Sequence, residues 1–226
     1  MSGILITGAA GGIARPLCLR LAGNGHRLHL VDRPGAPLDD VVQIVRDAGG
    51  KATTTESLLD SVEACSGVLA EAGPLFALVH LAGVFEPDPL GPEDMEIWDR
   101  ALGNNLTNAY ILAGIASKAI MAEGLTEGSG RMVFISSLAF NRGSWEHVPY
   151  ACAKGGLVGL IRASARRYAP KILVNGLAPG IIDTPMPAQI IAERGERVIN
   201  EIPLRRFGHP DEVAGVIQFL LGPDSS

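Results

Sequence analysis

Short apolar runs alternate with longer amphipathic segments along the whole sequence. Each run is almost continuously apolar, which is typical of strands in a parallel sheet that is covered on both faces. Successive strand–helix–strand units of this kind build doubly wound sheets with right-handed crossovers. The pattern therefore predicts an α/β fold, a doubly wound parallel sheet flanked by helices on both faces. The expected strands span residues 4–6, 28–31, 52–55, 76–80, 131–135 and 171–174, and the expected helices span roughly residues 12–22, 38–48, 58–72, 93–121, 149–168, 187–200 and 210–221.

The chain is long enough to build one complete core. With 226 residues, of which 47% are apolar, it can bury that core without disulfides or metals. No linker, composition shift or internal repeat divides the sequence. We therefore expect residues 1–226 to form a single domain.

Charge and cysteine usage narrow the classes of function. The net charge is −5 and no run of like charges occurs, which leaves no electrostatic footprint for nucleic acid or an anionic membrane. Three widely spaced cysteines without a C-x-x-C pair argue against a disulfide framework or a zinc site and favour a reducing compartment. The sequence shows neither a signal peptide nor the run of about 18 apolar residues that a membrane helix needs. We expect a cytoplasmic protein that acts on small molecules without a metal.

A glycine-rich turn follows the first expected strand at Gly8, Gly11 and Gly12. Such a turn lets the backbone approach a ligand closely, and the helix N-terminus after it favours a pyrophosphate. Asp32 ends the second strand about 20 residues later, where an acidic side chain accepts hydrogen bonds from an adenosine ribose. Taken alone, the glycines would serve backbone geometry and Asp32 would form a turn. Together they predict a dinucleotide site.

A tyrosine and a lysine, Tyr150 and Lys154, open a helical segment at spacing i and i+4, which places both on one helix face. A phenol titrates near pH 10, and a neighbouring ammonium lowers that pKa toward the range that general acid–base chemistry needs. Ser137 follows the strand that ends at Ile135, at the edge of the sheet where ligands bind in open α/β folds. The pair alone is a weak signal, because Tyr-x-x-x-Lys occurs by chance in many proteins.

Six segments, in order along almost the whole chain, carry a more specific pattern. They are Thr7–Ala14 (T-G-x-x-x-G-x-G), Leu78–Gly83 (N-N-A-G), Asn105–Thr107 (N-L-T), Ile135–Ser137 with Tyr150 and Lys154 (I-S-S…Y-x-x-x-K), Pro179–Thr184 (P-G-x-x-x-T) and Ile202–Ala214 (I-P-L-x-R-x-G-x-P-x-E-V-A). In these segments the sequence resembles the short-chain dehydrogenase/reductase family. The resemblance is to its compact single-domain branch of 3-oxoacyl reductases and hydroxyacyl or alcohol dehydrogenases, which implies a Rossmann-like fold.

The resemblance implies a catalytic tetrad of Ser137, Tyr150, Lys154 and Asn105. Tyr150 would exchange a proton with the substrate oxygen, and Ser137 would hydrogen-bond that oxygen. Lys154 would lower the pKa of Tyr150 and hold the nicotinamide ribose, and Asn105 would hold a water that links Lys154 to solvent. The cofactor-binding residues implied by the resemblance are Gly8, Gly12, Ile13, Asp32, Ala82, Gly83, Tyr150, Lys154, Pro179, Ile182 and Thr184.

The implied activity is NAD(P)-dependent hydride exchange with a secondary alcohol or ketone. Asp32 favours NAD over NADP, because a carboxylate accepts hydrogen bonds from the ribose 2′-hydroxyl and repels a 2′-phosphate, although Arg33 could soften this preference. The alternative is a catalytically silent nucleotide-binding or redox-sensing protein, which need not retain all four tetrad residues. A sugar-nucleotide epimerase fits poorly, because such proteins usually carry an additional C-terminal substrate domain.

Assembly into a homodimer or homotetramer is also expected. The resemblance implies it, and Gly155, Gly156 and Gly159 would let a second helix approach the helix of Tyr150 closely. The alternative is that these glycines only accommodate the chain's own sheet or the cofactor.

Several positions depart from the family pattern. Ala14 replaces the last glycine of the first motif, and His80 with Leu81 replaces the paired asparagines. We interpret His80 as a core or strand-end histidine rather than a catalytic base. The third strand ends near Glu56, where the family offers an Asp to the adenine amino group. The family continues past Ser226 into a T-G…D-G-G segment, so we expect its final strand to be absent and the neighbouring edge to be open.

Residues 185–205 are expected to form a short substrate lid with one apolar face, although ordinary core packing would give the same pattern. An apolar face suits a hydroxyacyl or alicyclic substrate better than a free sugar. Arg142 could meet an acidic substrate group, but a solvated loop arginine is the simpler interpretation. The apolar face comprises Met186, Ile190, Ile191, Val198 and Ile199, and further candidates for the pocket wall are Phe140, Asn141, Trp145, Glu146 and His147.

Overall fold

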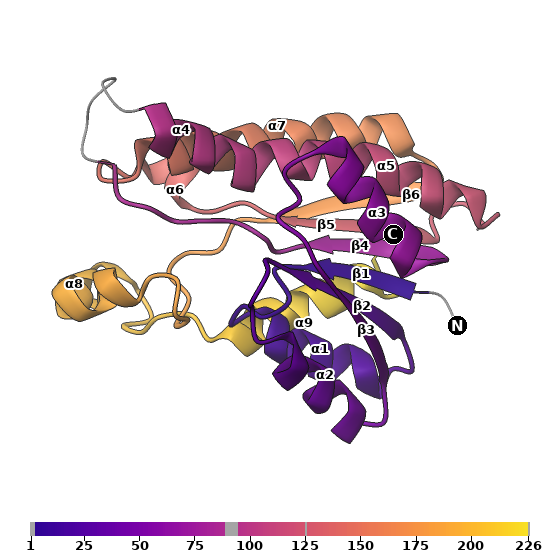
Figure 1. Cartoon of the computed structure of the whole chain (residues 1–226). Coiled ribbons are helices and arrows are strands. Elements are labelled where there is room, and N and C mark those ends of the chain that lie inside the picture. The colour runs from indigo at the N-terminus through magenta and orange to yellow at the C-terminus, as the bar shows by residue number, and fades with distance from the viewer. Residues whose placement is uncertain (1–2, 89–94, 125, 226) are drawn as a thin grey trace.

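The structure, a computed structural model, describes residues 3–88, 95–124 and 126–225. Within these residues one sheet contains six parallel strands in the order β3-β2-β1-β4-β5-β6 (Figure 1). This arrangement confirms the predicted doubly wound sheet. The strands are β1 Gly3–Thr7, β2 Arg27–Asp32, β3 Lys51–Glu56, β4 Leu75–His80, β5 Gly130–Ile135 and β6 Ile172–Leu177.

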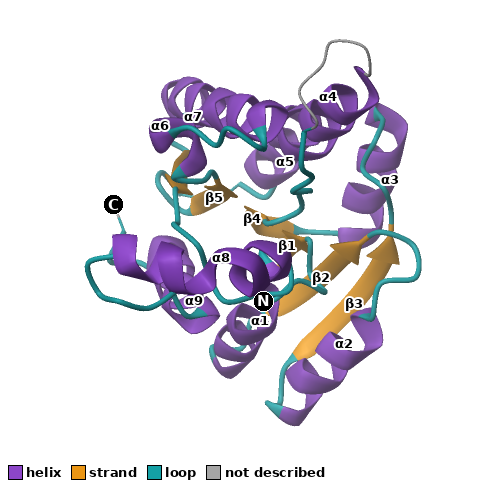
Figure 2. Cartoon of the chain, turned by 90° about the vertical axis from the view of Figure 1, so that its left-hand side faces the viewer, coloured by secondary structure: helices purple, strands orange, loops and turns teal. Residues whose placement is uncertain are grey.

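Helices cover both faces of the sheet, as the sequence predicts (Figures 1 and 2). Successive side chains of a strand point to opposite faces, so β1 places Ile4 and Ile6 in one core layer and Leu5 in the other. All three side chains are completely buried. One layer contains α1 (Ala14–Gly23), α2 (Leu38–Asp47) and α9 (Pro210–Leu221), and the other contains α3 (Val62–Ala72), α5 (Asn108–Ala122) and α7 (Val148–Tyr168).

The helix expected over residues 93–121 is divided in the structure. Residues 93 and 94 lie outside the described residues, and α4 (Met95–Leu102) is followed by a π-helical turn, η1 (Gly103–Thr107), before α5 begins. Asn105 donates a side-chain hydrogen bond to the carbonyl of Ala101, four residues earlier, at 3.0 Å. Such local bonds compete with the regular helical ladder, which is why the apolar periodicity alone predicted an unbroken helix.

Two further boundaries differ from the sequence-based expectation. The helix expected from residue 58 begins at Val62, because the Ser61 hydroxyl caps it by accepting the backbone N–H of Ala64 at 3.1 Å. A short helix, α6 (Ala139–Arg142), was not predicted. Within the described part of the chain, no helix is long and apolar enough to cross a membrane.

The strand order reverses between β1 and β4. The chain leaves β1 toward β2 and β3, and then returns to place β4, β5 and β6 on the other side of β1. In open α/β sheets, ligands bind outside the carboxyl ends of the strands at such a switch point. The last long helix to be placed, α8 (Ala188–Glu201), stands apart from both layers beyond these strand ends (Figure 1).

We expect Gly8→Ala to lower the free energy of unfolding by about 2–4 kcal/mol. Gly8 has a φ of +67°, and an added Cβ would lie 2.6 Å from the Ala82 nitrogen, so strain and a backbone clash act together. The matched control is Gly35→Ala, because Gly35 has a φ of +75° and open space around it. Urea unfolding measures both. Equal losses in the two variants would contradict the close approach at Gly8.

Candidate active site

The glycine turn lies directly against the end of β2. The Asp32 carboxylate accepts the backbone N–H of Ala10 at 2.9 Å through one oxygen and that of Arg33 at 2.8 Å through the other. These bonds fix the carboxylate beside the turn. A Cβ added to Gly12 would lie 2.6 Å from the Thr184 methyl carbon, so the turn also meets the Pro179–Thr184 segment.

Lys154 and Tyr150 project from the first turns of α7 toward the end of β5. The Lys154 ammonium donates to the Ile135 carbonyl at 2.9 Å and lies 5.5 Å from the centre of the Tyr150 ring. Both side chains are buried, with 6% and 8% exposure. Ser136 anchors the helix here, because its hydroxyl donates to the Lys154 carbonyl at 2.7 Å.

Burial governs the pKa of both groups. It lowers the pKa of Lys154 to about 8, because a dry environment disfavours the ammonium. Burial also raises the pKa of Tyr150, while the hydrogen bond with Ser137 acts in the opposite direction. The sequence predicted a lowering of the Tyr150 pKa by Lys154; here burial is the larger influence on that phenol.

Asn105 lies in the π-helical turn, completely buried. Its amide nitrogen donates to the carbonyls of Val84 and Ala101, each at 3.0 Å, while its oxygen has no hydrogen-bond partner. A Cβ on Gly83 would lie 2.5 Å from that oxygen and 3.4 Å from the Lys154 nitrogen. An unpartnered acceptor and a buried ammonium thus flank Gly83. Single π-helical turns are frequent at functional sites.

His80 replaces an asparagine of the family pattern at the end of β4. Its Nδ1 lies 2.8 Å from the Thr7 hydroxyl, and its side chain is only 2% exposed. Burial, followed by the nearby Lys154 charge, lowers the pKa of His80 to about 3, although the Asn108 side chain opposes part of this shift. The ring is therefore neutral near pH 7, in agreement with the interpretation as a core histidine.

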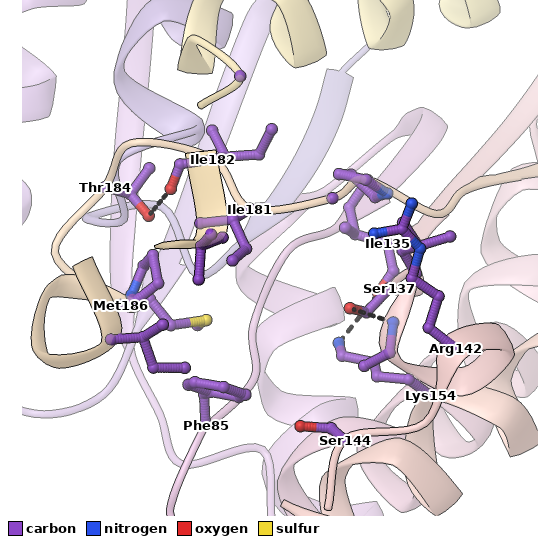
Figure 3. A pocket seen from close by; sticks show the side chains of 18 of the residues that line it. Phe85, Ile135, Ser137, Arg142, Ser144, Lys154, Ile181, Ile182, Thr184 and Met186 are labelled. Atoms are coloured by element: carbon purple, nitrogen blue, oxygen red, sulfur yellow. Dashed lines mark hydrogen bonds between the residues drawn. The ribbon is translucent and has the colours of Figure 1, made fainter. Parts of the chain in front are cut away.

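These strand ends border a cavity of about 660 Å³ (Figure 3). Figure 3 shows Ser137 and Lys154 on one side of it, with Ile181, Thr184 and Met186 across the opening. Of the residues singled out by sequence, the cavity is lined by Ser137, Tyr150, Lys154, Ile13, Gly83, Pro179, Ile182 and Thr184. Gly8, Gly12, Asp32, Ala82 and Asn105 are not among the lining residues.

The expected lid helix is present as α8. Met186, Ile190 and Val198 line the cavity, whereas Ile191 and Ile199 do not. Its position is fixed by Arg194, whose guanidinium forms a two-pronged salt bridge with Glu146 from the segment before α7. The same guanidinium lies 5.6 Å from the ring centre of Trp145. Among the candidates between Ser137 and Tyr150, Arg142 lines the cavity, but Phe140, Asn141, Trp145, Glu146 and His147 do not.

Comparison with known proteins decides the family. A family model described as enoyl-(acyl carrier protein) reductase matches residues 8–226. The chain is 30% identical over 239 residues to a (3R)-3-hydroxyacyl-CoA dehydrogenase of Mus musculus, across 98% of this chain and 89% of that protein. The chain belongs to the short-chain dehydrogenase/reductase family.

Solved structures agree with this assignment. A variant of the actinorhodin polyketide ketoreductase with NADPH gives a TM-score of 0.89 at 28% identity, covering 99% of this chain and 91% of that one. A 3-oxoacyl-[acyl-carrier protein] reductase from Brucella melitensis in complex with NAD gives 0.89 at 28% identity, with coverage of 99% and 90%. This short-chain dehydrogenase/reductase is an NAD(P)-dependent oxidoreductase that acts on CH–OH groups, and the catalytically silent alternative is not supported.

Phe85 is an active-site residue of this reductase that the sequence did not reveal. It lines the cavity, stacks on His147 with ring centres 3.9 Å apart, and contacts Tyr150 edge-on at 4.8 Å. His147 and Tyr150 lie three residues apart at the start of α7, so one ring from the loop after β4 packs against both. No periodicity or motif marks Phe85, because its contacts join distant segments.

We expect Lys154→Met to stabilise the cofactor-free enzyme by about 3 kcal/mol below pH 8, because the pKa falls from 10.5 to about 8 on folding. This advantage should shrink between about pH 8 and 10.5, since the wild-type lysine loses its charge first in the folded state. Thermal unfolding against pH measures it. The control Lys118→Met removes an exposed lysine and should show no such trend. A Lys154→Met advantage that is absent or constant with pH would contradict the burial argument.

Proposed function

We propose that the enzyme interconverts a secondary alcohol and its ketone with NAD, using Tyr150 as the proton donor or acceptor. The observation that supports this most is the meeting of Tyr150, Ser137 and Lys154 in one cavity at the carboxyl end of β5. General acid–base groups must reach the substrate oxygen directly, and an open cavity beside the phenol provides that access.

Each tetrad residue has a distinct task in this proposal. Tyr150 exchanges a proton with the substrate oxygen, and Ser137 hydrogen-bonds the same oxygen as charge develops. Lys154 holds the nicotinamide ribose, and Asn105 holds a water between Lys154 and solvent. The bound nicotinamide supplies or accepts the hydride. Thr184 and the backbone of Ile182 hold its carboxamide.

Tyr150→Phe tests the assignment. We expect kcat to fall by about 10²–10⁴-fold, because the ring still packs but the proton-transfer group is lost. NADH binding, followed by its fluorescence, should stay close to wild type. A Phe variant that retains half of the wild-type kcat would rule out the role given to Tyr150.

The cofactor preference rests on Asp32. Its carboxylate is fixed by two backbone N–H groups at the end of β2, whereas the Arg33 side chain is exposed. A fixed anion at that position repels a 2′-phosphate, so NAD is preferred to NADP. Proteins of similar structure carry NADPH or NAD, so the neighbours alone do not decide the preference.

We expect wild-type enzyme to have the higher kcat/KM with NADH than with NADPH, measured with one ketone. Asp32→Ala should remove most of this preference, because the repulsive charge is lost while the glycine turn remains. A wild type that favours NADPH, or an Asp32→Ala variant with an unchanged ratio, would show that Asp32 is only a turn residue.

The substrate class and the assembly are parts of the same proposal. Apolar lining by Phe85, Met186 and Ile190 suits a hydroxyacyl or alicyclic substrate, and the relative from Mus musculus is a hydroxyacyl-CoA dehydrogenase. A homodimer or homotetramer remains the expected state. Gly159 has open space around it, but Gly156 makes room for the chain's own Leu106, since an added Cβ would lie 2.6 Å from that side chain. The cytoplasmic location stays a prediction.

A further inference from the structure

The charged side chains that line the catalytic cavity differ in one respect. Arg206 pairs with Glu212 through two contacts of 2.7 and 2.8 Å, and Lys154 donates to a backbone carbonyl at 2.9 Å. Glu201 lies 3.8 Å from an arginine one turn earlier on α8. Arg142 lines the same cavity, yet its guanidinium makes no hydrogen bond or ion pair with any residue that the structure describes.

The position of Arg142 is set by the active-site framework. It is the last residue of α6, where its backbone N–H donates to the Leu138 carbonyl at 3.0 Å. Leu138 in turn donates its own N–H to the Pro179 carbonyl at 2.9 Å, which ties α6 to the segment after β6. Figure 3 shows Arg142 on the same side of the cavity as Ser137 and Lys154. The cation therefore has a fixed place near the reacting groups.

The other side of the cavity is apolar. Phe85, Ile181 and Met186 lie across the opening from Arg142 (Figure 3). An apolar wall that faces an unpaired guanidinium is complementary to a molecule with a hydrocarbon body and one negatively charged group. Arginine suits such a group well, because its planar fork matches a carboxylate with two parallel hydrogen bonds.

We propose that Arg142 binds a carboxylate of the substrate, so that the enzyme acts on an apolar hydroxy acid or keto acid. This inference rests on the proposed function, since it assigns the reacting carbonyl to the same cavity. The competing explanation is a solvated arginine that only complements the C-terminal dipole of α6. That explanation predicts no preference for an anionic ligand.

Binding distinguishes the two explanations without requiring turnover. The probes are cyclohexanecarboxylate and its neutral counterpart cyclohexanecarboxamide, titrated by calorimetry into the full chain saturated with NAD⁺. We expect the carboxylate to bind wild type about 10- to 100-fold more tightly than the amide, as a charge-assisted hydrogen-bonded pair provides. Arg142→Gln should bring the two affinities to within about threefold, and Arg142→Lys should retain part of the preference.

The matched control is Arg197→Gln. Arg197 lies on α8 with 82% of its side chain exposed and outside the cavity lining, so its loss changes net charge equally but should leave the preference intact. Equal affinity of wild type for the two probes, binding of neither at millimolar concentration, or a preference that survives Arg142→Gln would overturn the inference. Tyr150→Phe should keep the preference. A failure of the proposed chemistry would appear instead as absent ketone reduction with the binding preference unchanged.

Discussion

The structure around the site depends on a buried ammonium, that of Lys154. A charge with 6% exposure is unfavourable unless its donors are occupied, and the carbonyl at the end of β5 accepts one of them. This requires the start of α7 to lie against the end of β5, and the hydroxyl of Ser136 holds it there. Tyr150, one turn earlier on the same helix, is thereby brought beside Ser137. The desolvation that lowers stability is the same desolvation that places proton chemistry in a dry cavity.

The cofactor side of the site depends on close backbone approach rather than on charge. Gly8 and Gly12 leave no room for a Cβ, because Ala82 and Thr184 press against them. These contacts join the turn after β1 to the segments after β4 and β6, on both sides of the switch point. A methyl group at either glycine would separate parts of the fold that must meet around one dinucleotide.

Regular elements and motif residues could be predicted from the sequence, because periodicity and spacing are local properties. The strand cores and most helices follow from apolar patterning, and the Tyr150–Lys154 pair follows from i, i+4 spacing. The π-helical turn around Asn105 could not be predicted, because side-chain hydrogen bonds override an unbroken helical pattern there. Contacts between distant segments were also missed, including Phe85 on His147 and Arg194 on Glu146. Such contacts arise only when the sheet order places separate loops together.

The central claim is that hydride passes directly between the nicotinamide and a carbinol carbon held beside Tyr150. The most direct measurement follows deuterium from NADH labelled at one C4 position at a time, with cyclohexanone as substrate in ordinary water. The account predicts deuterium at the carbinol carbon of the alcohol from one labelled form, and retention of the label in the oxidised cofactor from the other. A carbinol hydrogen that comes from solvent, or equal transfer from both C4 positions, would contradict it.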